Sequence, residues 1–148
     1  MKKLCTAAAI LAIVCSCHIM IAADFKPYPG ATLDAKATKE GTEVAQKMDP
    51  KSIATVYTTG DPFAKVAAFY KSIGTEYAMP RASGTTGQPK NRPGGELWEA
   101  YFILDGAADL AGSRSWVKVQ RPAIGLYMED MPDMKVRDVT VILLSQKK

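Results

Sequence analysis

The strongest constraint on the fold is an apolar run near the N-terminus, because it separates a leader from the rest of the chain. A short positive head, Met1 to Lys3, precedes twenty mostly apolar or small residues from Leu4 to Ala23. Such a head and run, with small residues at the end, are typical of a secretion signal, here cleaved after Ala23. Twenty residues would also suffice to cross a bilayer uncleaved, as a membrane anchor. We therefore expect a signal peptide at 1–23 and one folded domain at 24–148.

A second interpretation of the leader centres on Cys17. The segment Val14-Cys15-Ser16-Cys17 is a weak match to a lipoprotein signal, since Val14 stands where Leu is usual. The residues that follow Cys17 also stay apolar, whereas a lipoprotein normally turns polar there. Lipidation at Cys17 would tether the domain to a membrane. Signal peptide, lipoprotein and anchor all place the folded domain outside the cytoplasm, in the periplasm or secreted.

All cysteines and the only histidine of the chain lie in this leader. They are Cys5, Cys15, Cys17 and His18. The remaining 125 residues therefore lack a thiol and an imidazole, which excludes Ser-His-Asp and Cys-His catalysis and Cys/His zinc sites there. Without disulfides in an oxidising compartment, the domain must be stabilised by its core alone.

The net charge gives no sign of a nucleic-acid partner. The whole chain carries +4, and removing Lys2 and Lys3 leaves 17 basic residues against 15 acidic ones, a net charge of +2. This balance lacks the basic footprint of nucleic-acid binding. We expect a protein or small-molecule partner instead. Membrane contact is expected only through lipidation at Cys17 or an uncleaved leader.

The clearest secondary-structure signal is a strand followed by a helix. Ser52 to Thr59 is rich in β-forming residues, and Gly60 ends that strand. Asp61 is placed to cap a helix over 62–73, which Gly74 ends. Its apolar stripe consists of Phe63, Val66, Ala67, Tyr70 and Ile73.

Other strands are predicted on either side of this unit. Residues 31–38 alternate weakly between apolar and polar, which favours a strand. Residues 39–51 are ambiguous, because Gly41 and the Asp-Pro turn at 49–50 limit any helix to about two turns. Further strands are predicted at 98–104, 116–120 and 136–144.

The long segment 79–96 is rich in proline and glycine and has no periodicity. It carries Arg81, Lys90 and Arg92, and we interpret it as a solvated loop. The sequence shows no internal repeats, and we expect no second domain. We therefore predict a single small α+β domain, with a mainly antiparallel sheet and one principal amphipathic helix packed on one face.

Three segments carry a resemblance to known sequences. They are Tyr28–Ala31 (YPGA), Val56–Tyr70 (VYTT-x-DPF-x-KV-x-x-FY) and Trp116–Pro122. Together they resemble a group of small exported bacterial proteins of unknown function. The resemblance implies a bacterial, extracytoplasmic, single-domain protein, and it carries no activity.

Three methionines form the most specific candidate site in the sequence. Met128, Met131 and Met134 recur at every third residue between two predicted strands. Thioethers are soft ligands that suit Cu(I), so the three side chains are a candidate copper site. The alternative is that they are flexible apolar side chains at the edge of the core.

The carboxylates offer weaker candidates. Glu129, Asp130 and Asp133 could hold Ca²⁺, but they lack the spacing of a calcium-binding loop. Two pairs, Glu96 with Glu99 and Asp105 with Asp109, could act in glycoside hydrolysis, although such pairs occur by chance in any soluble chain.

Aromatic side chains on predicted strands could stack on a ligand, although they more often fill the core. They are Tyr57, Trp98, Tyr101 and Trp116. We expect a non-enzymatic extracytoplasmic binding or interaction module without a cofactor. The alternatives are a periplasmic copper-handling protein that uses the methionines and, third, a carboxylate-dependent hydrolase.

Overall fold

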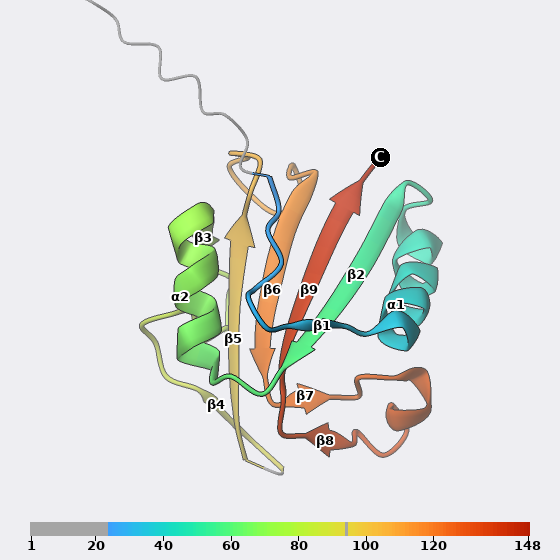
Figure 1. Cartoon of the computed structure of the whole chain (residues 1–148), viewed down its shortest axis with the longest axis vertical. Coiled ribbons are helices and arrows are strands. Elements are labelled where there is room, and N and C mark those ends of the chain that lie inside the picture. Colours follow the sequence, from blue (N-terminus) through green and yellow to red (C-terminus); the bar gives the residue numbers. More distant parts are fainter. Residues whose placement is uncertain (1–23, 94) are drawn as a thin grey trace, which may run out of the picture.

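A computed structural model describes residues 24–93 and 95–148, which are organised around one antiparallel sheet (Figure 1). Its strands follow the order β1-β2-β9-β6-β5-β3, and β4 also pairs with β5. The strands are β1 (Thr32–Leu33), β2 (Ser52–Thr59), β3 (Thr75–Tyr77), β4 (Lys90–Arg92), β5 (Gly95–Ile103), β6 (Ser115–Arg121) and β9 (Thr140–Lys147). The predicted leader, including Cys17, lies outside the described residues.

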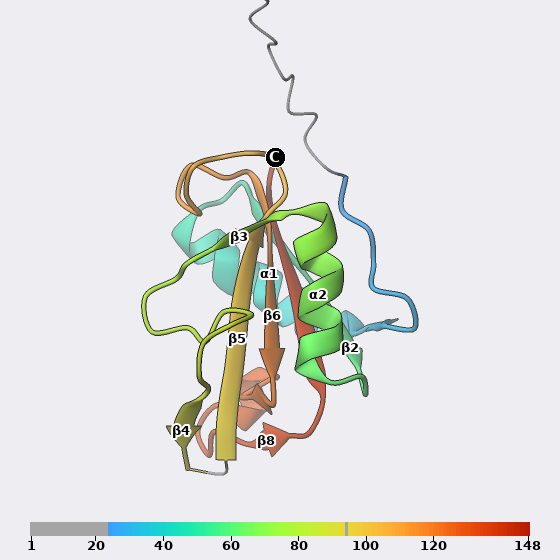
Figure 2. The same cartoon turned by 90° about the vertical axis from the view of Figure 1, so that its left-hand side faces the viewer.

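Two helices lie on opposite sides of this sheet, α1 (Ala35–Met48) and α2 (Phe63–Ile73) (Figure 2). The connection from β6 to β9 adds a small hairpin. It contains β7 (Ala123–Ile124), the 3₁₀ helix η1 (Met128–Asp130) and β8 (Val136–Arg137). The α+β class and the mainly antiparallel sheet are as predicted. No helix among the described residues is both long enough and apolar enough to cross a membrane.

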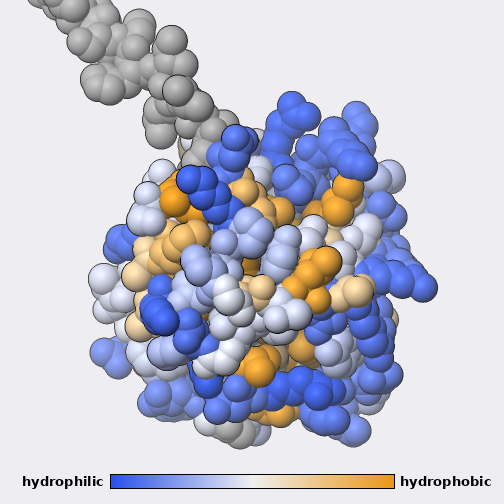
Figure 3. Space-filling model, viewed as in Figure 1, coloured by the Kyte–Doolittle hydropathy of each residue, from blue (hydrophilic) through white to orange (hydrophobic). Residues whose placement is uncertain are grey.

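The main core lies between α2 and one face of the sheet. The predicted stripe is confirmed, since Val66 and Tyr70 are fully buried and Ile73 packs at the edge of the core. The sheet contributes Ala100, Phe102, Val117, Val119, Ile142 and Leu144. On this face, hydrophobic side chains reach the surface only in small separate patches (Figure 3). Helix α2 and the N-terminal segment, which adds Phe25 and Tyr28 to the core, therefore close this side of the molecule (Figure 1).

The predicted cap of α2 is wrong. Pro62 occupies the N-cap position, with no side-chain hydrogen bond to the helix. The Asp61 carboxylate instead accepts hydrogen bonds from the Tyr28 hydroxyl at 2.6 Å and from Lys65 at 2.9 Å. The reason is that Asp61 lies beside the N-terminal segment, where the tyrosine is a competing donor.

The prediction for residues 31–51 is also largely wrong. Only Thr32 and Leu33 form a strand, and a fourteen-residue helix of about four turns follows from Ala35. Asp34 caps this helix by accepting a hydrogen bond from the backbone N–H of Ala37 at 2.9 Å. Gly41 does not end the helix, because it lies in the contact with β2, where a Cβ would come within 3.4 Å of the Cβ of Ala54.

Helix α1 covers the outer edge of β2, where β1 pairs only with Tyr57 and Thr58. The Thr42 hydroxyl donates to the carbonyl of Ala54 at 2.8 Å and accepts from its N–H at 3.1 Å. The Thr38 hydroxyl likewise accepts from the N–H of Val56 at 2.9 Å. These two threonines therefore replace the missing strand partner, which protects the edge from pairing with another chain.

The segment predicted as a structureless loop, 79–96, is partly ordered. Lys90–Arg92 form β4 and pair with the start of β5. The Ser83 hydroxyl accepts from the N–H of Glu99 at 2.8 Å and donates to its carbonyl at 3.0 Å. These bonds satisfy the backbone of β5 between its pairings with β3 and β4. The predicted strands at 52–59, 98–104 and 116–120 are confirmed as β2, β5 and β6. The run at 136–144 divides into β8 and β9.

Candidate functional site

The face of the sheet opposite α2 is only partly covered, and the uncovered part forms a groove that we call the sheet groove. Its volume is about 390 Å³. Strands β6 and β9 form the floor, α1 forms one wall, and the 122–139 connection closes one end. The lining includes Ala37, Glu40, Gly41, Val44, Ala45, Ala54, Val56, Trp116, Lys118, Gln120, Ala123, Ile124, Gly125, Leu126, Tyr127, Met128, Met131, Val141, Leu143 and Ser145.

The groove has an apolar side towards β9 and α1. Val141 and Leu143 alternate with the buried core residues of β9, so their side chains point away from α2 and into the groove. Val44 of α1 faces the same hollow and is 43% exposed. Met128 and Met131 add two flexible thioethers at the closed end.

The opposite side of the groove, along β6, is polar. Lys118 and Gln120 lie two residues apart on one face of the strand, opposite Leu143 and Val141 of β9. The Lys118 ammonium donates to one carboxylate oxygen of Glu99 at 2.9 Å. Lys90 donates to the other oxygen at 2.7 Å. Two lysines therefore share one carboxylate beside the groove.

The Glu99 carboxylate is held in its charged form. Burial would raise its pKa, since Glu99 is only 8% exposed. The hydrogen bonds and charges of Lys118 and Lys90 outweigh burial, so the pKa lies below its ordinary value. This carboxylate is therefore an ion-pair partner rather than a proton donor near neutral pH.

The 122–139 connection is fixed to α1 by polar contacts. The Tyr127 hydroxyl donates to Asp34 at 2.8 Å, and the N–H of Met128 donates to Glu40 at 2.8 Å. Two cations lie over the Tyr127 ring, Lys36 at 4.7 Å and Arg137 at 4.9 Å from its centroid. The closed end of the groove is therefore well defined.

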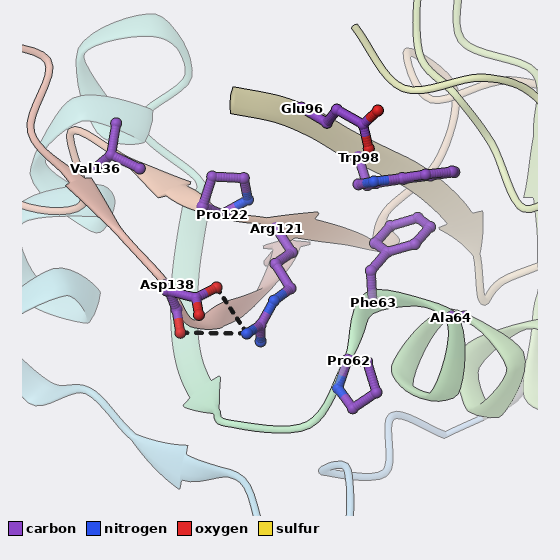
Figure 4. Close-up of a pocket in the computed structure, with 9 residues that line it drawn as sticks. All are labelled: Pro62, Phe63, Ala64, Glu96, Trp98, Arg121, Pro122, Val136 and Asp138. Atoms are coloured by element: carbon purple, nitrogen blue, oxygen red, sulfur yellow. Dashed lines mark hydrogen bonds and ion pairs between the residues drawn. The ribbon is translucent and has the colours of Figure 1, made fainter. Parts of the chain in front are cut away.

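A second hollow, of about 510 Å³, lies beside Trp98 and the start of α2 (Figure 4). Its central polar group, the Arg121 guanidinium, donates to the carbonyl oxygens of Gly60 and Asp61, to Thr140 and to Asp138. These contacts tie the turn before α2 to the start of β9. The Arg121 guanidinium thus already bonds to groups of the fold, which makes this hollow a weaker candidate for ligand binding than the sheet groove.

The fold brings only two of the three methionines of the predicted copper site to the sheet groove. Met128, Met131 and Met134 are 52%, 49% and 50% exposed. The first two line the sheet groove, whereas Met134 is not among the lining residues. Within residues 24–93 and 95–148, no group of three His, Cys, Asp or Glu side chains could hold a metal ion. That finding does not concern thioethers, so the copper site stays a prediction.

The acidic side chains considered for calcium have other partners. Glu129 pairs with Lys36 at 2.7 Å. Asp130 is buried and receives two hydrogen bonds from Arg137, both at 3.0 Å. Asp133 is exposed.

The carboxylate pairs considered for hydrolysis lie on opposite faces of a strand in one case and accept hydrogen bonds from neighbouring residues in the other. Glu96 and Glu99 are three apart on β5, so their side chains leave opposite faces of the sheet. Asp105 accepts from the Ser113 hydroxyl at 2.9 Å, and Asp109 accepts from the N–H of Gly112 at 2.7 Å. Burial would raise the pKa of Asp105, but its hydrogen bonds lower it, whereas a general acid needs a raised pKa.

Of the four aromatic candidates, only Trp116 lines the sheet groove. Tyr57 packs on Phe25, and Trp98 packs on Phe63. The sequence interpretation missed Lys118. The sequence feature that could have indicated it is the alternation of 116–120. That alternation places a tryptophan, a lysine and a glutamine on one face of a strand and two valines on the other.

Comparisons with known proteins give no further identification. The chain matches no protein-family model, no curated protein and no solved structure at a significant level. The resemblance to small exported bacterial proteins stays a prediction from the residues that carry it.

Proposed function

We propose that the protein is a small, non-enzymatic, extracytoplasmic binding module whose sheet groove holds a ligand with an apolar body. The observation that carries this proposal is the uncovered apolar strip formed by Val141 and Leu143 in the floor of the groove. Export rests on the predicted leader at 1–23. The groove itself supports the binding role.

The size and lining of the sheet groove support a small-molecule ligand. Ligand sites are usually concave, 300–1,000 Å³ in volume and mainly apolar, with a few polar groups that fix orientation. The groove has a volume of about 390 Å³, and its polar side chains are few: Glu40, Lys118, Gln120 and Ser145, with the polar ends of Trp116 and Tyr127. The two methionines could adapt to ligands of different shape, since thioether side chains repack easily.

The chemistry around the groove supports binding rather than catalysis. Glu99 is held as a carboxylate by two lysines, and Glu40 accepts the N–H of Met128. The Glu99 pKa, lowered by these ion pairs, does not suit a proton donor near neutral pH, as acid–base catalysis would require.

Intrinsic fluorescence can test this proposal. Trp116 lines the groove and Trp98 does not, so a Trp98→Phe variant reports on the groove alone. Titration of this variant with decanol should give a saturable change in Trp116 fluorescence. A further Leu143→Gln change in the floor should weaken binding at least tenfold, because it replaces apolar contact with an amide.

The matched control is Leu33→Gln, which makes the same change at a residue of β1 that is 51% exposed and away from the groove. It should bind decanol as the parent does. Absence of saturation in the parent, or equal weakening by the two glutamine variants, would contradict the proposal.

A further inference from the structure

We propose that the sheet groove selects anionic amphiphiles, in which an aliphatic body covers the apolar strip and a carboxylate is bound by Lys118. This inference rests on the proposed binding function and adds the chemical class of the ligand. It follows from where the cation lies relative to the apolar strip.

The register of the sheet places the cation and the apolar strip side by side. Lys118 of β6 is the direct antiparallel partner of Leu143 of β9, so both side chains leave the same face. Gln120 lies next along β6, opposite Val141. A ligand lying along β9 would thus have apolar side chains beneath its body and an ammonium group beside it.

Lys118 keeps capacity for an additional acceptor. An ammonium group has three N–H donors. Among the described residues, the acceptor found for Lys118 is Glu99, at 2.9 Å. The side chain is 24% exposed and borders the groove. A ligand carboxylate could therefore bind without breaking the existing ion pair.

The local charge also favours an anion on this side. Glu99 is shared by Lys118 and Lys90, so the three side chains carry a net charge of +1. The acidic side chain of the groove, Glu40, belongs to the opposite wall and is turned to the N–H of Met128. The polarity of the groove thus orients the ligand, with its anionic end on the β6 side.

The length of the groove floor limits the aliphatic body. Along β9 the floor runs from Val141 through Leu143 to the polar Ser145, four residues from end to end, which corresponds to about 13 Å along a strand. Within that length, each added CH₂ should raise the affinity about fourfold, the factor expected for burying one methylene. Affinity should stop rising once the strip is filled.

The test compares three ten-carbon probes on the Trp98→Phe protein by Trp116 fluorescence. They are decanoate, decanol and decyltrimethylammonium, all below the concentrations at which they aggregate. Decanoate should bind at least tenfold more tightly than decanol, and the cation most weakly. Hexanoate and octanoate should give the chain-length series. The preference for decanoate should decrease with added salt, because it depends on charge.

A Lys118→Met variant should lose the preference for decanoate and retain decanol binding, since methionine keeps an apolar stem without the charge. Lys39→Met, at an exposed position of α1, is the matched control and should behave as the parent. Equal affinity of decanoate and decanol in the parent, or an unchanged preference in Lys118→Met, would overturn this inference and leave the binding function standing.

Two further outcomes have a different meaning. If no probe binds, the proposed function itself fails, and the ligand class fails with it. Because an anionic lipid presents the same chemistry, phosphatidylglycerol vesicles form a separate arm. Binding to these vesicles without binding to monomeric decanoate would overturn the groove as a site for a single amphiphile.

Discussion

At the scale of single residues, Glu99 shows how burial and charge compete. Its carboxylate is removed from water within β5, which alone would favour the protonated form. Lys118 and Lys90 reverse this preference through ion pairs at 2.9 and 2.7 Å. The sequence could not predict this cluster, because the lysines belong to β6 and β4 and meet the glutamate only through strand pairing.

This lowered pKa predicts an acid-sensitive contribution to stability. A carboxyl group whose folded pKa lies below its ordinary value of 4.5 stabilises the fold above that pH. The stabilisation is lost as the pH falls through the lower folded pKa. Glu99→Gln should therefore lower the free energy of unfolding at pH 7, and its deficit relative to the parent should shrink as the pH falls below 4.5 and through the lower folded pKa.

Urea unfolding at a series of pH values would measure this difference. Glu129→Gln is the control, because Glu129 is an exposed ion-pair partner with 66% of its side chain accessible. That variant should stay close to the parent throughout. A deficit of Glu99→Gln that stays constant down to the acid end of the series would refute the assigned role.

The methionines allow a second prediction at this scale. If Met128, Met131 and Met134 bind copper, the protein should take up one Cu(I) under anaerobic reducing conditions. Replacing all three with leucine should abolish that uptake without unfolding the domain, because the two side chains are similar in volume. Competition with a Cu(I) chelator would measure it. If the parent takes no Cu(I) from a weak chelator, the copper hypothesis is wrong.

At the scale of elements, prediction succeeded where an element packs one broad apolar face. Helix α2 has a continuous stripe from Phe63 to Tyr70, and β2 has alternating buried residues. The start of α1 was predicted as a strand and the rest was left ambiguous, because the helix contacts the edge of the sheet through small and polar residues, including Ala37, Thr38 and Thr42. Such a contact needs no broad apolar stripe. The sequence feature that could have indicated the start of this helix is Asp34, which precedes the helix and caps it.

The edge contact of α1 gives a prediction for Thr42. Thr42→Val keeps the shape of the side chain and removes the hydroxyl, so both the N–H and the carbonyl of the buried Ala54 lose their partner. Leaving such groups unsatisfied should cost about 1–3 kcal/mol of stability. Thermal or urea unfolding would measure the loss.

Thr42→Ser is the control for this change, because it retains the hydroxyl and should destabilise the protein less. The valine variant should also associate more readily, since an uncovered strand edge can pair with another chain. If the valine variant is as stable as the serine variant, the hydroxyl has no role at the edge of β2.

At the scale of the whole molecule, the sheet groove arises from topology. Its lining comes from two separate parts of the chain, residues 37–56 of α1 and β2 and residues 116–145 of β6, the 122–139 connection and β9. The strand order β2-β9-β6 brings them together, and that order cannot be read from periodicity. The class of fold and several of its strands were therefore predictable from the sequence, but the site was not.

The last prediction concerns export and where the folded part begins. Phe25 is already packed against Tyr57 and Tyr70, with ring centroids 5.7 and 6.1 Å away, and Tyr28 is buried in the same core. Cleavage after Ala23 would thus release a protein whose second residue belongs to the core. We expect the chain, expressed in a Gram-negative host, to occur outside the cytoplasm with Asp24 as its first residue.

Intact-mass measurement of the periplasmic and membrane fractions would test this expectation. A variant with Leu11→Asp, which interrupts the apolar run of the leader, should remain in the cytoplasm at full length, because a charge opposes entry of that run into the translocation machinery. A diacylglyceryl mass on Cys17 would favour the lipoprotein interpretation instead. Full-length protein that starts at Met1 in the cytosol, for both the parent and the variant, would show that the leader is not an export signal and would remove the extracytoplasmic part of the proposed function.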